Sequence, residues 1–501
     1  MALIYAGVAL VLLLAYFYNA QSKLPPGPSA IQLLASMLLS RNYIWKQFQQ
    51  WHKNYGPVIC LRIGQVTIIS IGDRKAAHAI LNRRSPIYSS RPRMVVAGEC
   101  ITKGLAPVLA PYGPQWIQFH KIHTTLLNAR RCRLYRPLQE LESRHLLFNL
   151  LSSNDFQTEF HRYASSLMYS LVYGKRFVSA DDPELKEIRH MVDVTSQAIS
   201  FGTWIVDIFP IFNCLPRSLA KWKRVGDDIH NRQTELFQQN TTAALNRPSW
   251  NLTKHCMLEP PVPVSPKEYM FVLAEFIEGG SDTTAAALMV SMLACVTRPA
   301  AMHIAQEELD KVVGDDRLPS FDDLPNLPYM TAFVEEVLRW RSLTPAGVAH
   351  APIRDDTYNG YSIPKGTCII ANHWSLDMDD DAFANPQSFV PERWIDNPKL
   401  QGHSAFGFGK RSCPGQHLAR ASLLLGLSRL FWAYDITWKQ DQGCSPEAVN
   451  MINGAVSRPA SFEAVFTIRS PARRRVVEEQ LPTETELEPV LDSIHQSICH
   501  E

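Results

Sequence analysis

The decamer Phe406-Gly407-Phe408-Gly409-Lys410-Arg411-Ser412-Cys413-Pro414-Gly415 decides the fold prediction for this chain. Its glycines permit a tight turn and the close approach of other groups to the Cys413 sulfur. The apolar run 414–433 predicts a helix, and free backbone N–H groups at a helix amino terminus stabilise a thiolate. Lys410 and Arg411 add positive charge. By themselves these residues indicate either a thiolate site for an anionic cofactor or a glycine-rich turn with an incidental buried cysteine.

Composition excludes several classes of protein. The 501 residues are 46% hydrophobic and 20% charged, which excludes wholesale disorder and a polytopic membrane protein. Lys and Arg number 50 against 48 Asp and Glu, so we expect no nucleic-acid partner. The ten cysteines are scattered without a C-x-x-C motif, which disfavours a zinc ribbon, an iron–sulfur cluster or a disulfide scaffold.

An apolar stretch without charge, Ala2–Tyr18, predicts a transmembrane anchor over residues 1–22. At a rise of about 1.5 Å per residue it spans about 26 Å, close to the thickness of a bilayer core. A cleaved signal peptide is the alternative, but the usual basic amino-terminal region is absent. Lys23 favours a cytosolic body, so we expect a single-pass protein of the endoplasmic reticulum membrane. Prolines within residues 23–29 predict a stiff hinge.

A long helix is predicted to begin at Ser265-Pro266-Lys267-Glu268 and to end near Arg298, before Pro299. Within it lies Gly279-Gly280-Ser281-Asp282-Thr283-Thr284. Each mid-helix glycine costs about 1 kcal/mol relative to alanine, and the charged Asp282 interrupts an apolar run. Such local penalties often mark function. A kinked core helix with an exposed aspartate is the equally open alternative.

The decamer matches F-x-x-G-x-R-x-C-x-G and so resembles the heme-binding signature of the cytochrome P-450 family. The resemblance implies that the Cys413 thiolate ligates the iron of heme b, which favours O–O bond cleavage. It implies that Phe406 packs near the sulfur and that Arg411 pairs with a heme propionate. The signature also includes Gly415, and His403 matches a position that reaches a propionate in many relatives.

The glycine-containing hexamer resembles the family's A/G-G-x-D/E-T-T/S pattern. The resemblance implies that Asp282 and Thr283 form a catalytic proton relay, and that Gly279 and Gly280 make room for dioxygen and substrate. Proton delivery by a hydroxyl and a carboxylate is the chemistry that this role needs.

Three further segments resemble the family. Glu336-Val337-Leu338-Arg339 and Pro391-Glu392-Arg393-Trp394 imply a buried network of Glu336, Arg339 and Arg393. Residues 112–121 resemble Y-G-x-x-W-R-x-x-R/H, which implies that Trp116 and His120 donate to a propionate. Ile117 stands where relatives often have arginine, so one ionic contact to heme is missing.

The resemblance implies a mainly α fold with small β-sheets, the cytochrome P-450 fold: a triangular helical prism with heme between the long distal helix and the helix after Cys413. We expect residues 30–470 to form the catalytic domain. The acidic segment 471–501 has little hydrophobicity, and we expect it to be a disordered, mobile tail.

The implied function is that of a monomeric heme-thiolate monooxygenase that receives electrons from NADPH through a cytochrome reductase. Scattered basic residues either form a reductase-binding face or are solvated charges; they are Lys121, Arg130, Arg131, Arg133, Lys410 and Arg420. The expected substrate is a hydrophobic small molecule, such as a fungal secondary metabolite. A reductase-independent isomerase or dehydratase and a non-catalytic heme carrier or sensor are the alternatives, and the intact Asp282-Thr283 pair argues against both.

Overall fold

The computed structural model describes most of the chain in two compact units. The described residues are 24–29, 32–33, 43–63, 66–199, 203–397, 399–400, 402–440, 443–452, 454 and 456–500. The predicted anchor over residues 1–22 lies outside them. The first unit comprises Met1–Arg93, Ala346–Ser375 and Phe408–Lys410, and the second comprises Met94–Pro345, Leu376–Gly407 and Arg411–Glu501.

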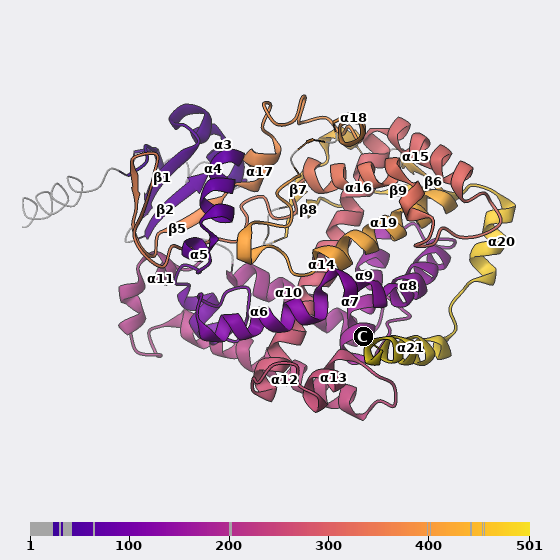
Figure 1. Ribbon diagram of the computed structural model, residues 1–501, viewed down its shortest axis with the longest axis horizontal. Helices are drawn as coiled ribbons and strands as arrows, with labels where there is room; N and C mark the ends of the chain where they lie inside the picture. The colour runs from indigo at the N-terminus through magenta and orange to yellow at the C-terminus, as the bar shows by residue number, and fades with distance from the viewer. Residues whose placement is uncertain are drawn as a thin grey trace, which may run out of the picture. The chain divides into compact units, whose positions relative to one another are not determined.

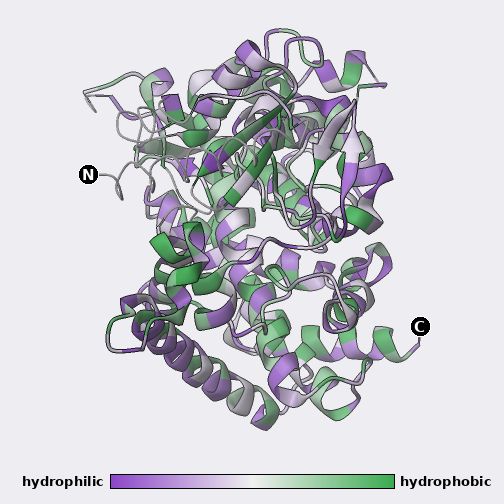
Figure 2. Ribbon diagram, turned by 90° about the vertical axis from the view of Figure 1, so that its left-hand side faces the viewer, coloured by the Kyte–Doolittle hydropathy of each residue, from purple (hydrophilic) through white to green (hydrophobic). Residues whose placement is uncertain are grey.

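The first unit is built on a three-stranded sheet of order β1-β2-β5. β1 (Val58–Ile63) pairs antiparallel with β2 (Val66–Ile71), and β5 (Cys368–Ala371) pairs parallel with β2. The strands are rich in β-branched residues, which suit a buried pleated surface, and Figure 2 colours much of them as hydrophobic. This sheet is one of the small β-sheets that the family resemblance implies. The same unit contains α3 (Ile44–Tyr55), α4 (Arg74–Ala77), α5 (Ser85–Tyr88) and the hairpin of β3 (Asp356–Tyr358) and β4 (Tyr361–Ile363).

The second unit is mostly helical, as the predicted fold class requires. Its two small antiparallel sheets pair β6 (Tyr434–Trp438) with β9 (Ala464–Ile468), and β7 (Met451–Ile452) with β8 (Arg458–Pro459). The chain passes between the two units within α17 (His373–Asp377). The α-helices of the second unit among the described residues are α6 (Pro114–Leu127), α7 (Ala129–Leu134), α8 (Arg136–Asn149), α9 (Phe156–Tyr173), α10 (Pro183–Ile199), α11 (Ile205–Ile208), α12 (Lys221–Asn246), α13 (Leu252–Leu258), α14 (Pro266–Thr297), α15 (Pro299–Val312), α16 (Pro328–Trp340), α18 (Arg393–Asp396), α19 (Gln416–Ala433), α20 (Pro471–Glu479) and α21 (Leu487–Cys499).

The long helix α14 confirms the prediction made from its caps. Ser265 and Glu268 form a complete capping box, in which the Ser265 N–H donates to Glu268 Oε2 at 2.8 Å. Among the described residues, α14 is the one helix long and apolar enough to cross a membrane, but 72% of its apolar window is buried inside the protein. It is therefore the central core helix of the second unit, and α9 runs beside it (Figure 1).

The core of the second unit positions the helix that follows Cys413. Leu427, Leu430 and Phe431 of α19 are fully buried and share one apolar cluster with Leu288 and Val290 of α14. Burial of each such side chain contributes about 1.5–3 kcal/mol. Because both helices are anchored in the same core, the start of α19 is held in place relative to α14.

The segment 471–501 differs from the mobile tail that we predicted. α20 and α21 are helices, and Leu487, Leu491, Ile494 and Ile498 are buried in the apolar cluster that also contains parts of α7 and α8. These four residues follow one helical stripe at spacings of four, three and four, while the acidic residues lie on the other faces. The prediction was wrong because overall acidity conceals this periodicity.

Candidate active site

The loop that carries Cys413 is closed by backbone hydrogen bonds within the second unit. The Cys413 N–H donates to the Phe406 carbonyl at 2.7 Å, and the Gly407 N–H donates to the Ser404 carbonyl at 2.8 Å. α19 begins three residues after Cys413, at Gln416, so the thiol stands at its amino-terminal end. Burial raises the pKa of the Cys413 thiol, while the Gly415 N–H and the Arg420 charge act in the opposite direction. A bound metal cation is the usual means of ionising such a thiol.

Three residues predicted to bind heme propionates are brought together. Trp116 and His120 stack on α6 with ring centroids 4.8 Å apart. The Arg411 guanidinium carbon lies 4.2 Å from the centroid of the Trp116 ring. Arg411 is further fixed by hydrogen bonds to the carbonyls of Pro107, at 3.0 Å, and Ala110, at 2.6 Å. The indole face therefore holds the guanidinium next to α6 by a cation–π contact.

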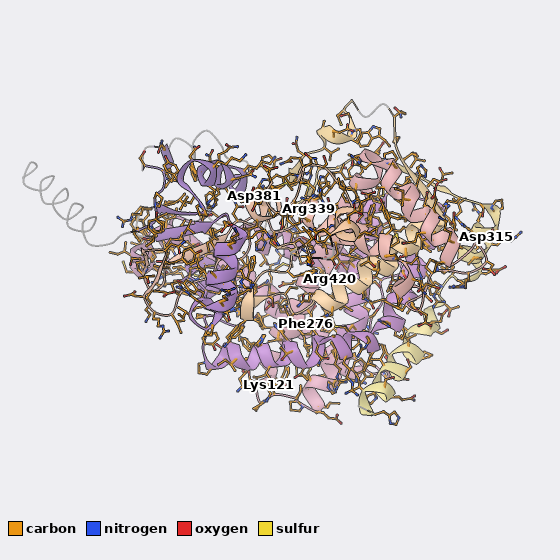
Figure 3. All side chains as sticks on the ribbon, turned by 45° about the horizontal axis from the view of Figure 1, so that its top comes forward. Lys121, Phe276, Asp315, Arg339, Asp381 and Arg420 are labelled. Carbon is orange, nitrogen blue, oxygen red and sulfur yellow. The ribbon has the colours of Figure 1, made fainter. Side chains whose placement is uncertain are left out.

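His123 is a candidate residue that the sequence did not single out. Its side chain is buried, and its Nε2 has no hydrogen-bond partner among the described residues. The ring lies 5.2 Å from that of Phe276 on α14, which is labelled in Figure 3. Burial, reinforced by the neighbouring charges of His120 and Arg411, lowers the pKa of His123 to about 3. Its position seven residues after Trp116, on the same face of α6, is the signal that points to it.

This donor set fits the heme that the Cys413 loop implies. A buried polar nitrogen without a partner costs about 1–3 kcal/mol, so the orphaned His123 nitrogen indicates a missing ligand atom. Arg411, His120 and Trp116 offer N–H donors beside it, which suit carboxylates such as the heme propionates. Cys413 offers the soft sulfur that suits iron.

His403 occupies a different role from the one expected. Its Nε2 bonds Glu335 Oε2 at 2.9 Å, its Nδ1 accepts the Ala405 N–H at 3.2 Å, and its side chain is 1% exposed. Both ring nitrogens are thus engaged by protein, so the expected propionate contact was wrong. Glu335 also accepts from Arg420 Nε at 2.9 Å, and the Arg420 guanidinium lies over Phe406. His403 braces the Cys413 loop instead.

Asp282 and Thr283, which are adjacent on α14, have different partners. The Thr283 hydroxyl donates to the Gly279 carbonyl at 2.6 Å. Asp282 Oδ1 lies 3.5 Å from His161 Nδ1 and 3.9 Å from Arg458 Nη1. Burial raises the pKa of Asp282, while the charge of Arg458 opposes that shift. A carboxyl group that holds its proton more readily is suited to donate it near neutral pH.

The two glycines of α14 are not equivalent. A Cβ atom at Gly280 would come within 2.7 Å of the Met168 sulfur on α9, whereas one at Gly279 would meet nothing within 4 Å. Gly280 therefore lets α9 pack closely against α14, and Gly279 alone faces open space. This corrects the expectation that both glycines make room for dioxygen and substrate.

The predicted network of Glu336, Arg339 and Arg393 is confirmed. Arg339 binds both carboxylate oxygens of Glu336, at 2.8 and 2.7 Å, and both side chains are fully buried. Arg393 Nε reaches the same carboxylate at 3.2 Å. The Val390 N–H and the Trp394 indole N–H also donate to it, at 2.9 and 3.0 Å. The carboxylate thus ties α16 to the segment before the Cys413 loop.

The comparisons with known proteins identify the family of the chain. The family model described as cytochrome P-450 matches residues 25–465. The chain is 40% identical over 472 residues to cytochrome P-450 monooxygenase aneD of Aspergillus aculeatus, which covers 92% of this chain and 91% of that protein. It is 40% identical to drtD of Aspergillus calidoustus, covering 94% and 91%, and 38% identical to astF of Aspergillus oryzae, covering 97% and 94%. Both of these are also named cytochrome P-450 monooxygenases.

Proposed function

The chain belongs to the cytochrome P-450 family and is a monooxygenase of that family, and on this premise we propose that it inserts one oxygen atom into a hydrophobic secondary metabolite. The observation that carries the proposal is the assembly of the Cys413 loop with Arg411, Trp116 and His120. This combination of a thiol at a helix start and a cluster of N–H donors matches the two ends of one ligand, an iron porphyrin with acidic side chains.

Heme b is the proposed cofactor, held by this chain's residues in three ways. Cys413 would supply the thiolate, and Gly415 is its neighbour at the start of α19, since a Cβ atom at this position would stand 3.9 Å from the sulfur. Arg411, Trp116, His120 and His123 provide the donors for the propionates. When bound, heme supplies the iron at which dioxygen is activated.

Asp282 and Thr283 are the proposed catalytic residues. Oxygen insertion with release of water consumes two protons, which have to reach a site that excludes bulk solvent. The Thr283 hydroxyl donates to the Gly279 carbonyl, which holds its oxygen at a fixed position on α14, where it can accept a hydrogen bond. Asp282, the adjacent residue, provides an acid whose pKa burial has raised, so that it can reload the hydroxyl through water.

Electrons are proposed to come from NADPH through a membrane-bound cytochrome reductase. The apolar segment over residues 1–22 would anchor a monomeric chain to the endoplasmic reticulum, with the body in the cytosol. Arg130, Arg131 and Arg133 on α7 include exposed side chains that suit an acidic partner. Reversing Arg130 and Arg131 to glutamate is expected to slow reduction at low ionic strength, and an unchanged rate would exclude this surface.

The substrate class is argued from apolar surroundings and from the relatives. Val95, Val96, Ile101 and Phe276 are buried apolar residues, and we propose that their stretches of chain line the substrate pocket. The relatives named above come from fungi of the genus Aspergillus, and one further relative from Aspergillus ruber, 35% identical, is named echilunin cytochrome P-450 monooxygenase. We therefore place the substrate among hydrophobic fungal secondary metabolites.

The test supplies the purified protein with NADPH, a fungal cytochrome reductase and ¹⁸O₂ in the presence of hydrophobic metabolite extracts. A monooxygenase consumes oxygen only with the reductase and yields a product carrying one ¹⁸O atom. A product formed without NADPH or reductase would instead support the isomerase alternative, and no turnover in any extract by the heme-loaded protein would favour a carrier.

A further inference from the structure

A polar cavity of about 590 Å³ lies beside α14 within the second unit. It is bordered by the start of α9, by α10, by β9 and by the segment between β8 and β9. Its lining includes polar Gln157 and Ser461 and six charged or titratable side chains, those of Asp155, His161, Arg189, Lys439, Arg458 and Glu463. The apolar Met289 of α14 is also part of the wall. A cavity of this volume and polarity accommodates several water molecules.

Two residues of this wall are polar partners of Asp282. His161, from α9, places Nδ1 3.5 Å from Asp282 Oδ1, and Arg458, from β8, places Nη1 3.9 Å from the same oxygen. The His161 side chain is 6% exposed and that of Asp282 is 16% exposed. Asp282 is not itself part of the lining, so His161 and Arg458 stand between its carboxyl group and the cavity.

We propose that this cavity is the port through which solvent protons reach Asp282, and that His161 is the positioning residue that conducts them. The inference rests on the proposed role of Asp282 and deepens it by giving the carboxyl group a source of protons. Arginine at position 458 cannot take this part because its guanidinium does not release a proton in proteins. It instead holds the carboxylate in place between transfers.

The transfer is balanced in protons and involves no change in oxidation state. Neutral His161 accepts a proton on Nε2 from cavity water while its Nδ1–H passes to the Asp282 carboxylate, so one proton enters and one leaves the ring. The ring then returns to its first tautomer by rotation or by exchange with water. A neutral imidazole is what this step requires, and burial together with the charges of Arg189 and Arg458 lowers the pKa of His161 to about 3.

Burial, with the charge of Asp193 of α10, raises the pKa of Asp282 and so favours proton transfer toward it. The charges of Arg458 of β8 and Arg189 of α10 act in the opposite direction and help the carboxylate to release the proton again. On α14 itself, the Thr283 hydroxyl is turned to the Gly279 carbonyl. Asp282 thus has cavity-lining groups on one side and the relay hydroxyl as its chain neighbour.

The experiment uses the heme-loaded full chain with His161→Phe, which retains a buried ring without exchangeable protons. With NADPH and reductase but no substrate, oxygen is reduced either to hydrogen peroxide, with one NADPH per O₂, or to water, with two NADPH per O₂. Of these two products, only water requires cleavage of the O–O bond, and that cleavage depends on proton delivery. We expect His161→Phe to lower the ratio of water to peroxide by about tenfold or more. Glutamine can form hydrogen bonds but cannot accept a proton on one atom and release one from another. His161→Gln should therefore lower the ratio of water to peroxide as much as His161→Phe does.

The matched control is His190→Phe, because His190 is an exposed residue of α10 next to the cavity-lining Arg189. This variant should keep the wild-type ratio. Asp282→Asn should lower the ratio like His161→Phe, and an unchanged ratio in Asp282→Asn would reject the relay itself rather than the port.

A second readout is independent of turnover. The infrared band of the protonated Asp282 carboxyl group, identified by its loss in Asp282→Asn, should exchange with deuterated solvent more slowly in His161→Phe than in wild type. Equal exchange rates and an equal ratio of water to peroxide, in a His161→Phe protein that folds and binds heme normally, would overturn the proposal. If wild type consumed no oxygen, the proposed function would fail, and the exchange rate would still decide between a port and a closed cavity.

Discussion

Arg339 and Glu336 lie one helical turn apart on α16 and form a two-point ion pair with no exposure of either side chain. Burying two charges costs more than their attraction returns unless their remaining hydrogen-bonding capacity is met. Here Arg339 Nη1 donates to the carbonyls of Asp377 and Pro386, and the carboxylate accepts from Val390. The pair therefore joins α16 to the irregular segment that leads to the Cys413 loop.

Removing one member of this pair leaves the other charge buried and unpaired. We expect Glu336→Gln to lower the free energy of unfolding by about 3–5 kcal/mol and to reduce heme incorporation. Urea unfolding and the ratio of Soret to protein absorbance measure the two effects. Glu307→Gln, at an exposed position of α15, is the matched control and should change stability by less than about 0.5 kcal/mol. Wild-type stability in Glu336→Gln would contradict the structural role of the pair.

His123→Leu should have opposite effects on the free and the heme-loaded protein. Without heme, the variant loses a buried unsatisfied nitrogen, so its stability should rise by about 1 kcal/mol. With heme, it loses a propionate donor, and heme transfer to an excess of apomyoglobin should be about tenfold faster, equivalent to about 1.4 kcal/mol. A purely structural His123 would give the same direction of change in both states.

Gly409→Ala should disrupt the loop more than Gly407→Ala. Both glycines have positive φ, 58° and 69°, so alanine costs about 1–2 kcal/mol at either position. A Cβ atom at Gly409 would also collide with the Leu81 carbonyl oxygen and the Ser85 Cβ, whereas at Gly407 the nearest atom would be 3.9 Å away. Gly409→Ala is expected to lose additional stability and most of its heme in urea unfolding and Soret titration. Equal losses in the two variants would contradict the packing seen at Gly409.

The contribution of Glu335 to stability should depend on pH. Burial alone would raise its pKa, but the hydrogen bond from His403 and the charges of His403 and Arg420 outweigh it and lower the pKa to about 2, from 4.5. A lowered folded-state pKa stabilises the protein above pH 4.5, and this stabilisation is lost as the pH falls toward 2. The difference in urea midpoint between wild type and Glu335→Gln should therefore be constant above pH 4.5 and shrink below it. A difference that stayed constant down to pH 2 would show that Glu335 has an ordinary pKa.

Much of the fold follows from local rules that a sequence displays directly. The capping box of Ser265 and Glu268 and the proline at position 299 predict the ends of α14 because they act within one helical turn. The β-branched runs predict β1 and β2 for the same reason. The Cys413 loop is similarly local, since its glycines and its hydrogen bond from Cys413 to Phe406 lie within one decamer.

The features that could not be predicted depend on partners distant in sequence. His403 binds Glu335, 68 residues away, and nothing near either residue indicates that pairing. Gly280 was expected to make space for a ligand, but the neighbour that it accommodates is Met168 on α9. The net acidity of residues 471–501 predicts a mobile tail, whereas the structure has two helices there. An apolar stripe of one residue in three or four stabilises a helix only when another surface covers that stripe, and a sequence does not show that surface.

The spectrum of the reduced carbon monoxide complex tests the central claim most directly. The full chain, expressed with its heme and treated with dithionite and carbon monoxide, should show the red-shifted Soret band of a thiolate-ligated iron. Cys413→Ser, which removes the sulfur at the start of α19, should abolish that band even in protein that retains heme. A wild-type protein without the band, or a Cys413→Ser spectrum identical to that of wild type, would contradict the assignment of this loop as the heme-thiolate site.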